Sequence, residues 1–349
     1  MNISLRAGRK LACMLLMLCL ASSALAADEL PGNGKEVQPA SPSWSTGLFQ
    51  DALYNRALEE LGYTVKKPKE LSNSSFYQAI SRGDVDFWVN GWFPLHNALV
   101  PRDFREKAEV LGHVVQGGGI AGYLVSRKAA DKFGIHSLED FKRPDVKAAF
   151  DINGDGKADL VACPHGWACE KIIAHHLDTL DLNDDINAMT TSYTANMANT
   201  VSRAHSGQPV FFYTWTPNWT IAKLKPGKDV VWINVPQTSP ETSQKELEDK
   251  LVVQHLPGAV TDPINLGFIA NDIQVVANKQ FLSENPAARA LFEVMTIPLA
   301  DVAAQNAKMF EGESSPEDID RHVNTWIARN KKKWDSWIHA AKKAAAATH

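Results

Sequence analysis

The sequence predicts an α/β fold with two lobes, and three features support this prediction. The chain has 349 residues, of which 44% are hydrophobic and 22% charged, enough to fill two packed lobes. Strand and helix patterns alternate between residues 49 and 89, which favours a parallel sheet covered by helices. Gly117-Gly118-Gly119 before an apolar run predicts a flexible crossing into a second lobe, and residues 265–278 predict the return.

Periodic patterns define the elements of the first lobe. Apolar residues at every fourth position predict a helix over residues 49–61, which Gly62 ends in the left-handed conformation that suits glycine. We further expect a strand at 63–65, a helix around 76–80 that ends before Gly83, and a strand at 84–89 that Asn90-Gly91 breaks.

The second lobe follows the same reasoning. Ser137 to Asp140 form a capping pattern that predicts the start of a helix. The other predicted elements are strands at 123–125, 160–162, 210–214 and 230–233 and helices at 170–176 and 195–204.

The C-terminal part is predicted to be helical. Asn285-Pro286 and Ser315-Pro316 each supply an N-cap and a first-turn proline, and the apolar residues from Ile319 to Ile338 form one stripe of a single long helix. The tryptophans that we interpret as core residues are Trp88, Trp232, Trp326, Trp334 and Trp337.

Residues 1–26 have the three parts of a secretory signal peptide. Basic residues up to Lys10 precede ten apolar residues, and Ala24-Leu25-Ala26 ends the segment. Ten apolar residues are too few to span a bilayer, so we expect cleavage after Ala26 and a soluble, exported protein. A lipoprotein anchor at Cys19 is disfavoured because Leu18 before it is too bulky.

Loss of the signal peptide would remove three basic residues and no acidic ones, and would change the formal net charge from −4 to −7. This charge disfavours nucleic acid and acidic membranes as partners. Cys13 and Cys19 would leave with the peptide. The remaining pair, Cys163 and Cys169, is close in sequence and even in number, which favours a disulfide over a free catalytic thiol or a metal pair.

Residues 151–159 allow two interpretations. Asp151, Asn153, Asp155 and Asp159 place oxygen donors at positions 1, 3, 5 and 9 of a calcium loop, but Ala162 stands at position 12, where a bidentate Glu belongs. The alternative is an Asx-rich turn between a helix and a strand. In either case the segment is predicted to be structural, and no other cofactor is expected.

Three tryptophans follow predicted strands and lie beside Pro or Gly. Trp92, Trp167 and Trp215 are therefore expected on loops at the mouth of a sheet, where ligands of open α/β folds bind. The indole face attracts cations, at about 0.5 to 2 kcal/mol per contact. A trimethylammonium group has no N–H to donate, so such faces can select it where hydrogen bonds cannot.

A second ligand group must supply the remaining affinity. His96 lies four residues after Trp92, and Ala168 and Cys169 lie near a helix N-terminus, where free backbone N–H groups bind anions. These residues are candidates for binding a carboxylate through charge-assisted hydrogen bonds.

With these residues assembled, the chain resembles the periplasmic glycine betaine/L-proline-binding components of osmoprotectant ABC transporters. The resemblance covers nearly the whole mature chain, and the matching segments are residues 30–32, 57–65, 153–159, 213–217 and 225–232. It implies a two-lobed type II periplasmic binding protein, each lobe a mixed sheet flanked by helices, with the ligand in the cleft between lobe 1 (27–119 and 271–349) and lobe 2 (120–270).

The resemblance also implies residue roles. It implies a box formed by Trp92, Trp167 and Trp215, carboxylate contacts by His96 and the amides of Ala168 and Cys169, and a Cys163–Cys169 disulfide. Phe93 stands where the family has a small polar residue, and Ala168 where it has Gly. The implied protein is a periplasmic, non-enzymatic monomer that binds betaines, with proline as a further candidate ligand. It delivers the ligand to a membrane permease and its ATPase.

Three alternatives stay open at the level of sequence. The pocket can hold another quaternary ammonium compound, such as carnitine or choline. Tryptophan faces also stack on sugar rings, which allows a sugar-binding protein. An enzyme could use Cys169 as nucleophile with His165 or His96 as base, provided that the thiol is free.

Overall fold

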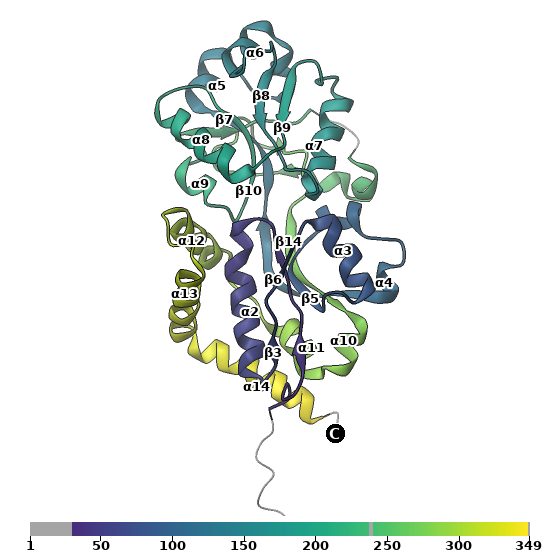
Figure 1. Ribbon diagram of the computed structural model, residues 1–349. Helices are drawn as coiled ribbons and strands as arrows, with labels where there is room; N and C mark the ends of the chain where they lie inside the picture. Colours follow the sequence, from purple (N-terminus) through teal and green to yellow (C-terminus); the bar gives the residue numbers. More distant parts are fainter. Residues whose placement is uncertain (1–29, 237–239, 348–349) are drawn as a thin grey trace, which may run out of the picture.

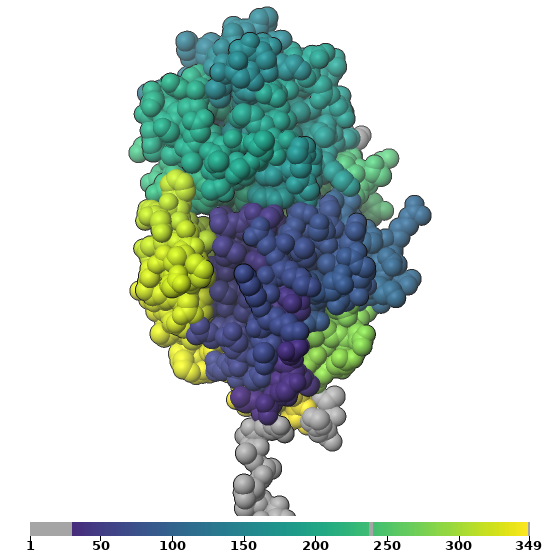
Figure 2. Space-filling model, in the orientation of Figure 1, coloured from purple at the N-terminus to yellow at the C-terminus, as the bar shows by residue number. Residues whose placement is uncertain are grey.

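The computed structural model describes residues 30–236 and 240–347 and shows two lobes stacked end to end (Figure 1). The predicted signal peptide lies outside the described residues. In the space-filling view, the teal lobe and the purple-to-yellow lobe meet along a narrow seam (Figure 2). Among the described helices, none is long and apolar enough to cross a membrane.

Lobe 1 is built on a three-stranded antiparallel sheet in the order β5-β14-β6. Its strands are β5 (Phe87–Phe93), β6 (Ala108–Gly119) and β14 (Asn271–Asn278). Short parallel pairs flank it: β1 (Glu36–Val37) with β3 (Thr64–Val65), and β2 (Ala40–Pro42) with β4 (Lys69–Leu71). The expected parallel sheet is therefore wrong for the main strands, because β14 returns from lobe 2 and takes the central position.

The helices of lobe 1 cover this sheet and form its outer wall (Figure 1). They are η1 (Ser45–Gly47), α2 (Leu48–Glu60), α3 (Asn73–Arg82), η2 (Leu95–Leu99), α4 (Phe104–Lys107), α10 (Lys279–Glu284), α11 (Pro286–Val294), α12 (Leu299–Phe310), α13 (Pro316–Arg329) and α14 (Lys331–Ala346). Gly62 and Gly83 follow α2 and α3 with positive φ angles of 92° and 77°, as predicted for helix ends.

Lobe 2 is built on a five-stranded mixed sheet in the order β11-β7-β10-β8-β9. Its strands are β7 (Ala121–Ser126), β8 (Ala158–Val161), β9 (Ile186–Met189), β10 (Phe211–Trp215) and β11 (Val230–Trp232). Its helices are α5 (Arg127–Phe133), η3 (Leu138–Lys142), α6 (Pro144–Phe150), α7 (Ala168–Thr179), α8 (Tyr193–His205) and α9 (Thr220–Lys223). The segment from β11 to β14 contains η4 (Thr242–Lys250), β12 (Val252–Val253) and β13 (Ile264–Asn265).

Two predictions based on glycine are wrong, and at Gly91 and Gly119 the reason is the same. Asn90-Gly91 does not break β5, and Gly117-Gly118-Gly119 ends β6 rather than forming a flexible crossing. A Cβ on Gly91 would lie 2.7 Å from Val276, and one on Gly119 would lie 2.5 Å from the carbonyl oxygen of Asn271. These glycines let β14 approach its neighbours closely, so they belong to the strands.

The predicted long C-terminal helix is two helices, α13 and α14, which separate at Asn330. Asn330 leaves helical geometry with φ −111° and ψ 22°, and its side chain donates a hydrogen bond to the Trp326 carbonyl at 2.9 Å. The tryptophans still pack as expected, since the rings of Trp326 and Trp337 stack with centroids 6.1 Å apart. The lobe boundaries at residues 119/120 and 270/271 stay a prediction.

Candidate functional site

All six predicted binding residues line one cavity. Trp92, His96, Trp167, Ala168, Cys169 and Trp215 share it with Trp44, Asn73, Leu95, Ala121, Tyr213 and Asn271. Its central volume of about 40 Å³ is enough for a few water molecules. Tryptophan and tyrosine rings make up much of the lining, and none of the described lining residues is an Asp, Glu, Lys or Arg.

The three tryptophans reach the cavity from different elements. Trp92 lies in β5 opposite Ile273, Trp215 is the last residue of β10 opposite Ala121, and Trp167 is the N-cap of α7. The prediction that all three lie on loops is wrong for Trp92 and Trp215, because their strands continue further than the sequence indicated. They still lie at or near the carboxyl ends of these strands.

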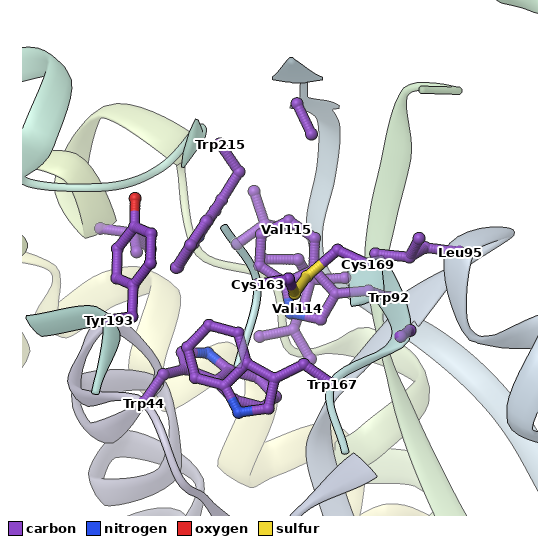
Figure 3. Close-up of a cluster of buried hydrophobic side chains, with 14 of the residues drawn as sticks. Trp44, Trp92, Leu95, Val114, Val115, Cys163, Trp167, Cys169, Tyr193 and Trp215 are labelled. Carbon is purple, nitrogen blue, oxygen red and sulfur yellow. A yellow bond between two sulfur atoms is a disulfide. The ribbon is translucent and has the colours of Figure 1, made fainter. Parts of the chain in front are cut away.

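The indole rings form adjoining walls (Figure 3). The centroids of Trp167 and Trp215 are 5.7 Å apart, with ring planes at 78° to each other. Trp44 meets Trp167 at 5.3 Å and 68°, and Tyr193 packs on Trp215 at 4.9 Å. At these distances and angles the edge of one indole packs against the face of the next, so the rings form a continuous aromatic lining.

Sequence reasoning missed Trp44 and Tyr213 as lining residues. Trp44 lies between two serines with no predicted strand before it, and Tyr213 lies inside a predicted strand, so neither pattern indicated a site. The neighbouring Ser43 accepts a hydrogen bond from Trp167 Nε1 at 3.0 Å. This contact holds the indole of Trp167, which belongs to lobe 2, against the N-terminal part of lobe 1.

The loop that carries Trp167 is fixed at both ends. Cys163 and Cys169 form the predicted disulfide, with Cα atoms 5.8 Å apart. Within the loop, the Gly166 N–H donates to Glu170 at 2.9 Å. Because Cys169 is in the disulfide, it offers no free thiolate, so the nucleophile required by the enzyme alternative is missing from this structure.

His96 is buried, with 2% of its surface exposed, and burial lowers its pKa to about 3. The imidazole is therefore neutral at physiological pH. The Trp92 N–H donates to Nδ1 at 3.2 Å, and the Tyr77 hydroxyl lies 2.8 Å from the same nitrogen. These partners assign the proton to Nε2, which faces the cavity side as a hydrogen-bond donor. Neutral His96 can donate a hydrogen bond to a ligand carboxylate, and in that bond only the carboxylate is charged.

A buried polar pair supports β5 beneath the cavity. Asn90 donates to the Asp51 carboxyl at 2.8 Å, and Ser41 donates to its other oxygen at 2.9 Å. Burial raises the pKa of Asp51 to about 8, against the opposing effect of these hydrogen bonds. Asp51 is therefore largely protonated at neutral pH, and it fixes the strand two residues before Trp92 without adding a full negative charge.

In the 151–159 segment, side-chain oxygens accept backbone hydrogen bonds. Asp151 accepts from Gly154 at 2.6 Å and from Gly156 at 2.9 Å, and Asp159 accepts from Ile152 at 2.7 Å. Among the residues described, no three His, Cys, Asp or Glu side chains are grouped to hold a metal. These contacts form the Asx-rich turn, and calcium binding at Asp151, Asn153, Asp155 and Asp159 stays a prediction.

Known proteins resemble this chain over most of its length. The family model for the substrate binding domain of the ABC-type glycine betaine transport system matches residues 35–329. The glycine betaine-binding periplasmic protein OusX of Dickeya dadantii (strain 3937) is 40% identical over 335 residues, which cover 96% of this chain and 98% of the relative. The glycine betaine/proline betaine-binding periplasmic protein of Salmonella typhimurium is 41% identical over 320 residues, 92% of this chain and 94% of the relative.

Solved structures agree on the fold. Lactococcal OpuAC, in its closed conformation with glycine betaine, matches with a TM-score of 0.64 at 18% identity, over 87% of this chain and 99% of that chain. An ABC-transporter choline-binding protein in complex with choline matches with a TM-score of 0.65 at 18% identity, over 90% and 97% of the two chains. From the family match and the two close relatives, we conclude that this chain belongs to the family of substrate-binding domains of ABC-type glycine betaine transport systems.

Proposed function

We propose that this protein binds glycine betaine, and related betaines such as proline betaine, in the aromatic cavity. Trp92, Trp167 and Trp215 would surround the trimethylammonium group. His96 Nε2 and the backbone amides of Ala168 and Cys169 would bind the carboxylate. Two curated relatives about 40% identical to this chain are named for glycine betaine binding, which supports this choice of ligand.

The observation that carries the proposal is the charge of the cavity. A betaine is a zwitterion with no net charge, so it needs aromatic faces at one end and hydrogen-bond donors at the other. The lining residues offer both and add no ionised carboxylate or ammonium. Choline, a net cation without a carboxylate, would gain from the rings only.

The sugar-binding alternative fits the lining less well. A sugar requires several polar side chains with free donors and acceptors around the stacked ring. Of the two lining Asn residues, Asn271 is already used, because its oxygen accepts from the Leu95 N–H and its amide donates to the Ile269 carbonyl, each at 2.9 Å.

In the cell, the protein would work as a periplasmic monomer after cleavage behind Ala26. It would bind the osmoprotectant between its lobes and deliver it to the permease and ATPase subunits of an ABC transporter. The periplasmic location of the curated relatives supports this placement.

Isothermal titration calorimetry of the exported protein tests the proposal. The panel is glycine betaine, proline betaine, carnitine, proline, choline and maltose. We expect one betaine site with a dissociation constant near micromolar, which corresponds to about 8 kcal/mol. Binding of maltose, or no binding of any betaine, would contradict the proposal. Preference for carnitine or choline would keep the binding class and change the ligand.

A further inference from the structure

Asn73 lines the cavity, but it is neither one of the three box tryptophans nor one of the proposed carboxylate donors. It is the first residue of α3, it is 2% exposed, and it lines the cavity. Its side-chain nitrogen lies 3.1 Å from His96 Nε2, and its side-chain oxygen accepts from the Ala168 N–H at 3.3 Å. The carboxamide of lobe 1 thus lies between two of the three groups that we assign to the ligand carboxylate.

Asn73 cannot satisfy both neighbours at once. His96 presents a donor at Nε2, since its Nδ1 accepts from Trp92, and Ala168 presents a backbone donor. A carboxamide has one acceptor oxygen and one donor nitrogen. Whichever way the amide is turned, one donor faces another donor. A carboxylate has the same planar shape with acceptors on both sides, so it would satisfy both.

We propose that the Asn73 carboxamide is an internal stand-in for the ligand carboxylate, which the ligand displaces when it binds. This inference rests on the proposed function, because it assigns the same donors to the ligand. Rotation of Asn73 away from these two contacts would free the His96 Nε2–H and the Ala168 N–H for the ligand carboxylate.

The stand-in makes Asn73 a specificity residue. A ligand with a carboxylate replaces a half-satisfied contact with a charge-assisted one, and this exchange favours binding. A quaternary ammonium ligand without a carboxylate does not displace the Asn73 side chain, so Asn73 does not change its affinity. Asn73 would therefore lower the affinity for zwitterions, which must displace it, and leave the affinity for simple cations unchanged.

Two variants and two probes test this proposal by calorimetry. Asn73→Ala removes the competitor, so glycine betaine should bind about threefold to tenfold more tightly, the equivalent of one neutral hydrogen bond. Asn73→Asp supplies a carboxyl group at a helix N-terminus, where the adjacent Ala168 N–H and His96 Nε2–H favour its ionised form. It should weaken glycine betaine binding at least thirtyfold, on the order of one charge-assisted contact, and tighten tetramethylammonium binding at least threefold.

Tetramethylammonium affinity should not change in Asn73→Ala. Gln78→Ala, at an exposed position of the same helix, is the matched control and should change neither affinity. Thermal melts confirm that each variant is folded. Unchanged or weaker betaine binding by Asn73→Ala would overturn the stand-in, and so would wild-type betaine affinity in Asn73→Asp.

A ligand-free readout separates this inference from the proposed function. In Asn73→Asp, the new carboxylate beside Nε2 should raise the pKa of His96 above its wild-type value, as measured by NMR titration of the imidazole. If the wild-type protein binds no betaine, the proposed function fails while this measurement still decides the position of residue 73. A pKa of His96 equal to that of wild type would overturn the stand-in.

Discussion

Replacement of Trp215 by alanine removes one wall of the proposed box. Trp215 is 7% exposed and packs against Trp167 and Tyr193. A desolvated cation–π contact is worth about 2 kcal/mol, which is about 30-fold in the dissociation constant. We therefore expect Trp215→Ala to weaken glycine betaine binding at least tenfold. Trp215→Phe keeps an aromatic face and should lose less affinity.

The same substitution also leaves a hole, and truncation of a buried tryptophan costs about 3 to 5 kcal/mol of stability. Trp337→Ala is the matched control, because Trp337 is 5% exposed and stacks on Trp326 outside the cavity. We expect both variants to lower the melting temperature and only Trp215→Ala to lower affinity. Calorimetry below the melting transition of each variant measures this. A dissociation constant equal to wild type in Trp215→Ala would exclude Trp215 from the box.

Choline should bind far more weakly than glycine betaine, and comparable calorimetric affinities would remove the carboxylate role of His96 and the two amides. The exported protein should show no titratable thiol in denaturant with an aromatic disulfide reagent, since Cys163 and Cys169 are paired, and two reactive thiols would contradict the disulfide. Because burial raises the pKa of Asp51 to about 8, its favourable protonated form is lost as pH rises through that value. Because Asn cannot ionise, the free energy of unfolding of Asp51→Asn, measured by urea melts, should rise relative to that of wild type as the pH increases from 4 to 9. A difference that does not change with pH would contradict the raised pKa of Asp51.

The sequence predicted which tryptophans line the cavity better than it predicted the secondary structure in which they lie. Trp92, Trp167 and Trp215 were found because an aromatic residue at the end of an apolar run is a local pattern. β5 extends past Trp92 because it pairs with β14, nearly two hundred residues away in sequence, and β10 extends to Trp215 because it pairs with β7. Long-range pairing of this kind leaves no trace in a local window.

The strand β6 was missed for a related reason. Four of its twelve residues are glycine, which lowers intrinsic strand propensity, and its place in the sheet comes from contact with β14. Asn73 was missed because Ser72-Asn73 looks like an ordinary helix start, and Ser72 is indeed the N-cap of α3. Its contact with His96 depends on the packing of α3 against η2, and its contact with Ala168 depends on how the two lobes meet, and a local sequence window shows neither.

A crystal structure of the exported protein with glycine betaine would test the central claim most directly. We expect the trimethylammonium group against the faces of Trp92, Trp167 and Trp215, and the carboxylate within hydrogen-bond distance of His96 Nε2 and the amides of Ala168 and Cys169. A betaine bound outside this cavity, or bound with its carboxylate toward the indole faces, would refute the proposed binding mode.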